Sequence, residues 1–117
     1  MKSPMIRAAV AALALGALTA CSSTPQPTAQ MAVAKSTVQR VSAAAPVTAH
    51  APVELQQARD LLAKAERAMA DKDYVAARRY AEDAEASAQV AESKAQAAEN
   101  QARLQAVKRG LQAVPAR

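Results

Sequence analysis

The chain contains no tryptophan and no phenylalanine, and its 117 residues include only two tyrosines, two glycines, one histidine and one cysteine. So few aromatic residues and glycines argue against a β-sheet with its turns. Alanine, the strongest helix former, is abundant throughout. We therefore expect an all-α fold whose core is built from small side chains and buries little apolar area per residue.

The scarcity of glycine, histidine and cysteine also argues against a catalytic or ligand-binding site. Only Gly110 lies beyond the first 20 residues, so no glycine-rich phosphate loop can form. The single histidine, His50, lies between two prolines and has no second histidine or nearby cysteine with which to bind a metal. Without a usable nucleophile–base pair, we expect no catalytic, cofactor-binding or metal-binding residue, no small-molecule substrate, and a protein that is not an enzyme.

One acidic cluster needs a separate explanation. It comprises Glu82, Asp83 and Glu85, preceded by two arginines. Carboxylates catalyse acid–base reactions when burial splits their pKa values, whereas charges four residues apart on a helix are surface neighbours. The sequence favours a solvated charged face.

The N-terminal segment has the layout of an export signal. Lys2 and Arg7 precede an apolar stretch from Ala8 to Leu18. This stretch of about 11 residues is shorter than the roughly 20 that a membrane-spanning helix needs. The sequence Leu-Thr-Ala-Cys follows, ends at Cys21, and resembles a bacterial lipobox, in which the chain is cut before the cysteine and the thiol is lipidated. Lipidation also accounts for a lone cysteine in an exported chain, where it has no disulfide partner.

We therefore predict that residues 1–20 are a cleaved signal peptide and that Cys21 carries a lipid anchor. The three acyl chains that the resemblance implies would hold firmly, at about 0.8 kcal/mol per buried methylene. Serines follow Cys21 where an aspartate often signals inner-membrane retention. We expect the outer membrane, facing the periplasm, with the inner membrane as the alternative. Cleavage lowers the net charge from +5 to +3 by removing Lys2 and Arg7, and the scarcity of aromatic side chains also argues against nucleic acid as a partner.

Residues 21–28 are expected to form a polar, proline-bearing tether that does not pack. A first helix is predicted over about 29–45, with Thr28 as its N-cap and Pro46 as its stop. Its apolar face consists of residues spaced three and four apart, namely Met31, Ala34, Val38, Val41 and Ala45.

A second helix is predicted over about 52–71, after a connector, and a third over about 74–109 with Asp73 as its N-cap. The second helix has a seam of alternating large and small residues, comprising Leu55, Ala58, Leu62, Ala65 and Met69. The third has an alanine ladder at 3.5-residue spacing: Tyr74, Ala77, Ala81, Ala84, Ala88, Ala91, Ala95, Ala98 and Ala102. Gly110 is expected just after the last helix, followed by a tail over 113–117.

This pattern predicts a helical domain over 29–112, a three-helix bundle in up-down-up order. The third helix would be longer than the second by about 16 residues, an overhang of roughly 24 Å. The candidate interaction residues lie on this overhang: Arg103, Leu104, Val107, Lys108, Arg109 and Leu111. The apolar ones form an exposed stripe, which typically marks an association surface, although a fraying helix end is the alternative. The cations would attract an acidic surface or stabilise the helix dipole.

The segment from Ala29 to Ala102 resembles a family of small bacterial lipoproteins, domain of unknown function 4398. The matching residues are Ala51-Pro52-Val53-Glu54-Leu55, Ala58-Arg59, Leu62, Ala65, Asp73-Tyr74, Ala77-Arg78 and the ladder to Ala102. The resemblance implies the fold and an envelope location, and it implies no activity or site residue.

The expected function is that of a non-catalytic structural or interaction element of the cell envelope, which presents a helical rod into the periplasm and contacts peptidoglycan or a protein partner. The alternatives are an accessory or adaptor subunit of an envelope complex, and a coiled-coil component that self-associates through the alanine ladder and the C-terminal stripe.

Overall fold

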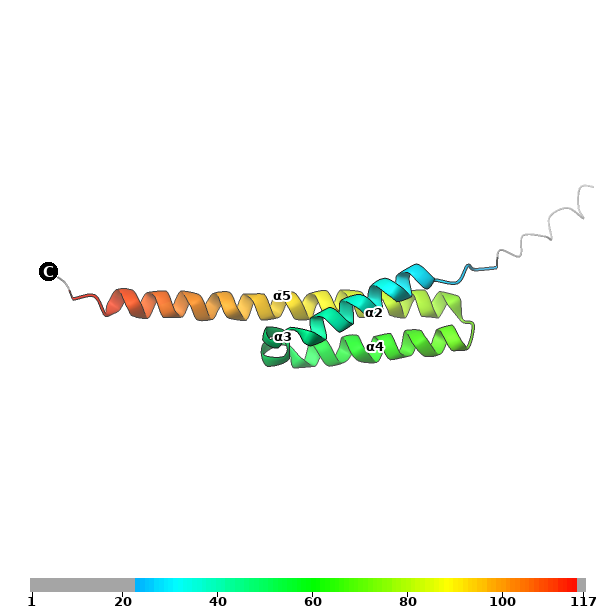
Figure 1. Cartoon of the computed structure of the whole chain (residues 1–117), viewed down its shortest axis with the longest axis horizontal. Coiled ribbons are helices and arrows are strands. Elements are labelled where there is room, and N and C mark those ends of the chain that lie inside the picture. The colour runs from blue at the N-terminus through cyan, green and yellow to red at the C-terminus, as the bar shows by residue number, and fades with distance from the viewer. Residues whose placement is uncertain (1–22, 116–117) are drawn as a thin grey trace, which may run out of the picture.

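The computed structural model describes residues 23–115, and these form an all-α domain (Figure 1). The predicted signal peptide, residues 1–20, and the predicted lipidation site, Cys21, lie outside the described residues. The helices are α2 (Thr28–Ala43), the short α3 (Ala45–His50), α4 (Pro52–Ala70) and α5 (Tyr74–Gln112).

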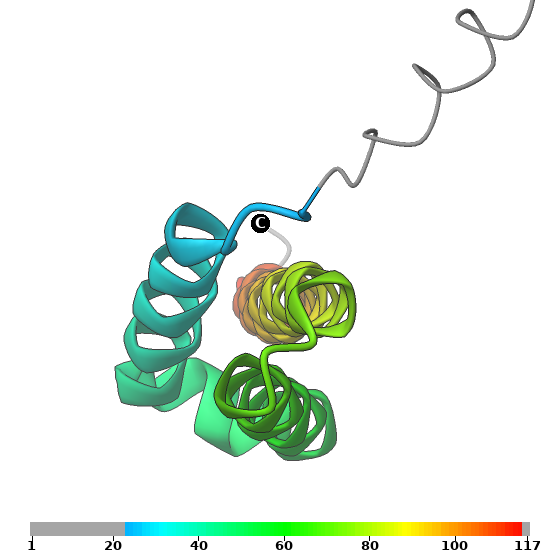
Figure 2. The same ribbon diagram turned by 90° about the vertical axis from the view of Figure 1, so that its right-hand side faces the viewer.

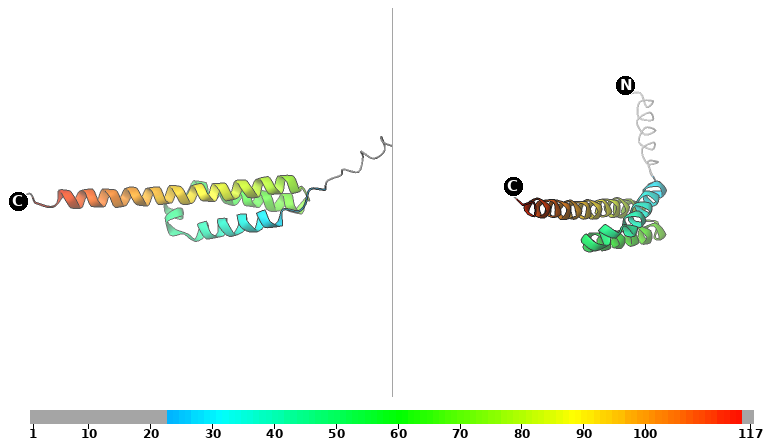
Figure 3. Two further views of the ribbon diagram at one scale, coloured as in Figure 1. Left: turned by 90° about the horizontal axis from the view of Figure 1, so that it is seen from above. Right: turned by 60° about the vertical axis from the view of Figure 1, so that its left-hand side comes forward.

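The three long helices run up, down and up, as the spacing predicted. Helices α4 and α5 form an antiparallel hairpin, and α2 crosses this hairpin obliquely in the same direction as α5 (Figure 1). Seen end-on, α2 and α4 cover two adjacent sides of α5 and leave its far side bare (Figure 2). Helix α5 continues straight beyond the other helices (Figure 3).

The core consists mainly of alanine. Among the described residues, 15 apolar side chains are buried, and 11 of them are alanines. Six of these come from the predicted ladder of α5: Ala77, Ala81, Ala84, Ala88, Ala91 and Ala95. Valines from α2 and α3 and Leu55 of α4 supply the larger groups on the opposite side. Small side chains allow the helix axes to approach closely, so the packing depends on keeping the ladder positions small.

Ion pairs on the rim of the core join neighbouring helices. Arg40 of α2 donates to Glu92 of α5 at 2.6 Å, and Lys94 of α5 donates to Glu54 of α4 at 2.6 Å. The hydrogen bond from Lys94, helped by the backbone N–H of Glu54 itself, lowers the pKa of the Glu54 carboxyl. Arg40 lowers the pKa of Glu92 in the same way.

The turn between α4 and α5 is held by backbone hydrogen bonds at the end of α4 and by a side-chain cap at the start of α5. The N–H of Asp73 donates to the carbonyl of Ala68, and that of Lys72 donates to Met69, which is the hydrogen-bond pattern of a Schellman motif. Lys72 adopts the left-handed conformation that this motif requires, with φ of 60°. The Asp73 carboxylate accepts from the N–H of Ala76, which confirms Asp73 as the N-cap of α5.

The start of the bundle differs from the prediction. Thr28 is the first residue of α2 and does not cap it, because the preceding Pro27 carbonyl accepts from Met31 N–H and Thr28 makes no capping bond. Pro27 is also fully buried, so the end of the predicted tether packs against the domain.

The predicted connector is largely helical. Helix α2 ends at Ala43, before Pro46, and Pro46 lies in the first turn of α3, where its missing N–H leaves no hydrogen bond unmade. Val47 of α3 is buried in place of Ala45, which is exposed. His50 is the last residue of α3 and is exposed.

The C-terminal end of α5 also differs. The alanine ladder is buried only to Ala95, Ala98 is half-buried, and Ala102 is exposed. Gly110 was expected after the helix, but α5 continues through it to Gln112. Gly110 does not adopt a positive φ, and no neighbour approaches the position of its missing Cβ. We call residues 100–112 the overhang; at 1.5 Å per residue it extends roughly 20 Å beyond the bundle.

Candidate interaction surface

The predicted interaction residues all lie on the overhang, where no other described part of the chain covers them. Its apolar side chains are half or more exposed, at 51% for Leu104, 59% for Val107 and 70% for Leu111, and Val114, just beyond the end of α5, is 68% exposed. Every residue from 101 to 115 is exposed. The overhang is therefore a surface of about three and a half helical turns that contributes nothing to the core formed by residues 23–115.

The cations of the overhang have few partners in the chain. Arg103 lies 3.9 Å from the Glu99 carboxylate on the preceding turn. The Nε of Arg109 donates to the carbonyl of Gln105 at 3.3 Å, as expected for a cation near a helix C-terminus. Within residues 23–115, Lys108 makes no ion pair. The basic side chains are thus available to an acidic surface.

The apolar stripe of the overhang does not continue the alanine ladder. At 100° per residue, Leu104, Val107 and Leu111 lie roughly 150° around the helix from Ala88 and Ala95. They therefore point away from the side of α5 that carries the buried alanine ladder. The overhang therefore exposes its apolar residues on the far side of α5, and its ladder side carries Arg109.

This stripe is longer than the sequence analysis predicted. Stepping back from Val114 by alternate spacings of three and four residues gives nine positions without a charged side chain: Ala86, Val90, Ser93, Ala97, Asn100, Leu104, Val107, Leu111 and Val114. All nine are exposed. We call them the outer stripe. The alanine ladder has the same 3.5-residue period, so the sequence pattern indicated only one seam. The lack of charged residues along the outer stripe was the feature that could have revealed the second seam.

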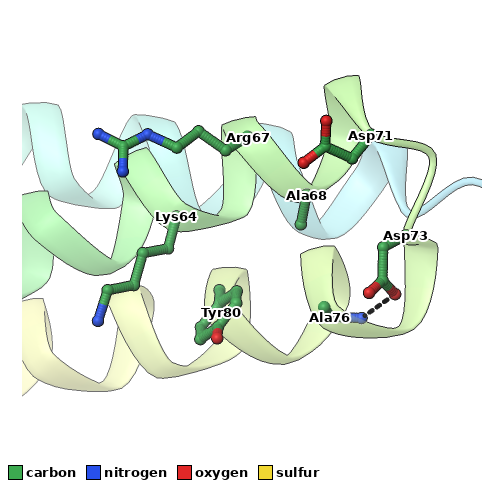
Figure 4. A pocket seen from close by; sticks show the side chains of 7 residues that line it. All are labelled: Lys64, Arg67, Ala68, Asp71, Asp73, Ala76 and Tyr80. Carbon is green, nitrogen blue, oxygen red and sulfur yellow. Dashed lines mark hydrogen bonds between the residues drawn. The ribbon is translucent and has the colours of Figure 1, made fainter.

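A shallow groove lies at the other end of the molecule, beside the α4–α5 turn (Figure 4). It has a volume of about 300 Å³ and is lined by Lys64, Arg67, Ala68, Asp71, Asp73, Ala76 and Tyr80. The Lys64 ammonium lies 6.0 Å from the centre of the Tyr80 ring, and Asp73 is occupied by capping α5. These contacts give the groove residues a structural role beside the α4–α5 turn.

Among the described residues, no group of three or more histidine, cysteine, aspartate or glutamate side chains could hold a metal ion. No helix between residues 23 and 115 combines the length and apolar character needed to cross a membrane.

The chain is thus an all-α domain with an alanine core and one helix that extends beyond the others. It belongs to the family described as Domain of unknown function (DUF4398), whose model matches residues 29–107. The match covers α2 from its second residue, all of α3 and α4, and α5 as far as Val107, and it confirms the resemblance found in the sequence. No curated protein and no solved structure matches the chain.

Proposed function

We propose that this protein is a non-catalytic structural or interaction element of the bacterial envelope, and that the overhang of α5 is its working surface. The observation that carries the proposal is the overhang itself, an exposed helix with apolar and cationic side chains that no other described element covers. A solvated helix needs no such apolar stripe, and exposed apolar patches typically mark association sites.

The anchor in this proposal is a lipid on Cys21, which would hold the protein in the outer membrane on its periplasmic side. The lipobox-like sequence before Cys21 supports it. Helix α2 starts at the same end of the bundle as the α4–α5 turn (Figure 1), so a chain anchored there would direct the overhang away from the membrane.

The anchor is tested in the full chain expressed in a Gram-negative host. We expect mass spectrometry of membrane-extracted protein to show an N-terminal peptide that begins at Cys21 and carries acyl chains. We expect Cys21→Ser to leave the leader uncut. An unmodified Cys21 thiol in the extracted protein would refute the anchor.

The acidic surface nearest to such an overhang is the cell wall, whose polymer carries carboxylates. Chain 22–117 contains every buried residue of the bundle, from Pro27 to Ala95, and is suited to solution experiments. We expect it to sediment with isolated wall sacculi at low ionic strength and to be released by about 0.5 M salt, at which the Debye length is only a few Å.

A matched pair of variants locates the contact. Replacing Arg103, Lys108 and Arg109 by glutamine should abolish sedimentation. Replacing Arg67, Lys72 and Arg79 by glutamine removes the same charge from exposed positions on the bundle and should leave binding intact. Equal losses in both variants, or no sedimentation of the unaltered chain, would exclude wall binding through the overhang.

A further inference from the structure

We infer that the outer stripe pairs with the outer stripe of a second copy of this chain, and that the two α5 helices run antiparallel. The inference goes beyond the proposed function, because it names a partner and a direction and does not depend on an anchor or on the wall. It stands on three observations: the continuity of the outer stripe, the sizes of its side chains, and the charges beside it.

The continuity of the outer stripe is that of a coiled-coil seam. Eight of its nine positions, from Ala86 to Leu111, lie within α5 at alternate spacings of four and three residues and cover about three and a half heptads, a length at which such a pattern predicts helix pairing. At 100° per residue the seam lies roughly 150° around α5 from the buried alanine ladder, and at its N-terminal end Ala86 and Val90 remain exposed beside a shallow groove that Glu54 and Gln57 of α4 also line. A second helix can therefore lie along it without displacing any helix of the bundle.

The sizes of the side chains favour an antiparallel pair. If the twofold axis that relates the two copies passes between residues 98 and 99, Leu104 lies opposite Ser93 of the second copy and Leu111 lies opposite Ala86. Val107 then faces Val90. Within α5 each leucine meets a small side chain and valine meets valine, so the distance between the helices stays even. Val114, beyond the end of α5, would face Asp83 and is not part of the pairing. In a parallel pair, leucine would meet leucine at one end and alanine would meet alanine at the other, and the helices would diverge.

The charges along α5 favour the same direction. Residues 82–94 contain four acids and one base, a net charge of −3, whereas residues 103–115 contain three bases and no acid, a net charge of +3. Antiparallel pairing places these two segments side by side in both halves of the dimer. Parallel pairing would place each segment beside its own copy, within a Debye length of about 10 Å at 0.1 M salt.

The charges nearest the seam are free to interact. Glu82, Asp83 and Glu85 make no ion pair within residues 23–115. In the antiparallel pair the cations beside the seam meet uncharged side chains, because Lys108 lies beside Ser87 of the second copy and Arg103 lies beside Gln96. In a parallel pair, by contrast, Arg103 would flank the seam beside Lys108 of the second copy, which is a repulsive contact.

The pairing has a consequence for an anchored protein. The N-terminal ends of the two bundles lie at opposite ends of the antiparallel pair. Two chains that are both anchored at their N-termini would hold the pair along a membrane surface, whereas a single chain could direct its overhang away from it. Arg103 and Lys108 would then be shared between the second copy and any acidic polymer, so pairing and wall binding would compete.

The first test measures mass. Chain 22–117 is studied by light scattering and sedimentation equilibrium up to about 1 mM, the concentration at which even weak pairs form. We expect twice the mass of the chain. Leu104→Glu with Leu111→Glu should raise the dimer Kd at least about tenfold. The control, Gln105→Glu with Gln112→Glu, adds the same charge at exposed positions off the stripe and should dimerise nearly as well as the unaltered chain. A monomer at all concentrations would overturn the inference.

The second test reads the direction. Chain 22–117 lacks Cys21, so the only thiols are those introduced by Ser93→Cys and Leu104→Cys. In the antiparallel pair these two positions face each other, whereas the two copies of position 104 are about 11 residues, or roughly 16 Å, apart along the axis. A disulfide needs Cα atoms within about 7 Å.

We therefore expect disulfide-linked dimers when the two single variants are mixed under mild oxidation, and few when either is oxidised alone. Efficient cross-linking of the Leu104→Cys variant by itself would show a parallel pair and overturn the assignment. Both tests use the isolated chain without wall material, so a failure of wall binding leaves their outcome unchanged. Circular dichroism of each variant confirms that the bundle is intact.

Discussion

The Nζ of Lys94 lies 2.6 Å from the Oε1 of Glu54, and this contact joins the first turn of α4 to the last covered stretch of α5. One turn further along α5, Ala98 is half-buried, and from Asn100 onward the side chains are exposed. The pair therefore marks the boundary between the part of α5 that belongs to the bundle and the part that is free to bind something else.

The stability of the bundle should fall in acid because of Glu54 and Glu92. Both pKa values are lowered in the folded chain, by Lys94 and Arg40 respectively. Their contribution is therefore fully present above the unfolded pKa, about 4.3, and is lost as the pH falls through the lower folded values. Urea unfolding between neutral pH and pH 3 measures this. The Glu54→Gln, Glu92→Gln double variant should have a flatter profile, and an unchanged slope would contradict the assignment.

Enlarging the alanine ladder should disrupt the bundle. Ala88 is fully buried, so Ala88→Leu inserts a larger side chain between closely spaced helices and should cost about 1–3 kcal/mol or more of unfolding free energy. Ala102 lies two heptads further along the same ladder but is exposed. Ala102→Leu should change the unfolding free energy by less than about 0.5 kcal/mol. Thermal and urea denaturation distinguish the two, and equal effects would refute the burial boundary.

Removing the overhang should leave the bundle intact. None of residues 101–115 is buried, so a chain that ends at Ala102 should keep its unfolding free energy within about 0.5 kcal/mol. The unfolding free energy should be measured at low micromolar protein concentration, where pairing with a second copy contributes least to stability. A large loss of stability would mean that the overhang packs against the bundle.

Lys72→Gly should stabilise the protein. Lys72 has φ of 60°, a conformation that costs a side-chain-bearing residue roughly 1–2 kcal/mol and glycine almost nothing. Part of this gain is offset by the greater freedom of glycine in the unfolded chain, so we expect a net gain of about 0.5–1 kcal/mol. Asp71→Gly is the control, because Asp71 has an ordinary helical φ of −78° and gains nothing. A loss of stability in the Lys72 variant would contradict the turn geometry.

Gly110→Ala should strengthen the overhang. Gly110 lies inside α5, and an added Cβ would meet no atom within 4 Å. Alanine in a helix interior is favoured over glycine by up to about 1 kcal/mol. Amide hydrogen exchange around residues 104–112 should slow, whereas Ala106→Gly should speed it. Faster exchange in the Gly110→Ala variant would indicate that the helix ends just before Gly110, as the sequence predicted.

Local features of the sequence predicted the local features of the structure. The alanine ladder predicted the buried face of α5 as far as Ala95, and Asp73 was correctly expected to cap that helix, because a side-chain oxygen there can accept a nearby backbone N–H. The errors at Thr28 and Pro46 have one cause. Each residue type can start or stop a helix, and the packing of Pro27 and Val47 chose between these roles. At Gly110 no packing is involved, and α5 continues through this exposed glycine.

The sequence by itself determined that the protein is helical, that its core is poor in large side chains, and that its last helix extends beyond the others, because composition and spacing act within one helix. Only the tertiary structure decided which of the two seams of α5 is used within the chain. Both seams repeat every 3.5 residues, and the choice rests on contacts with α2, α3 and α4, which bury the alanines and leave Val90 and Leu104 facing solvent.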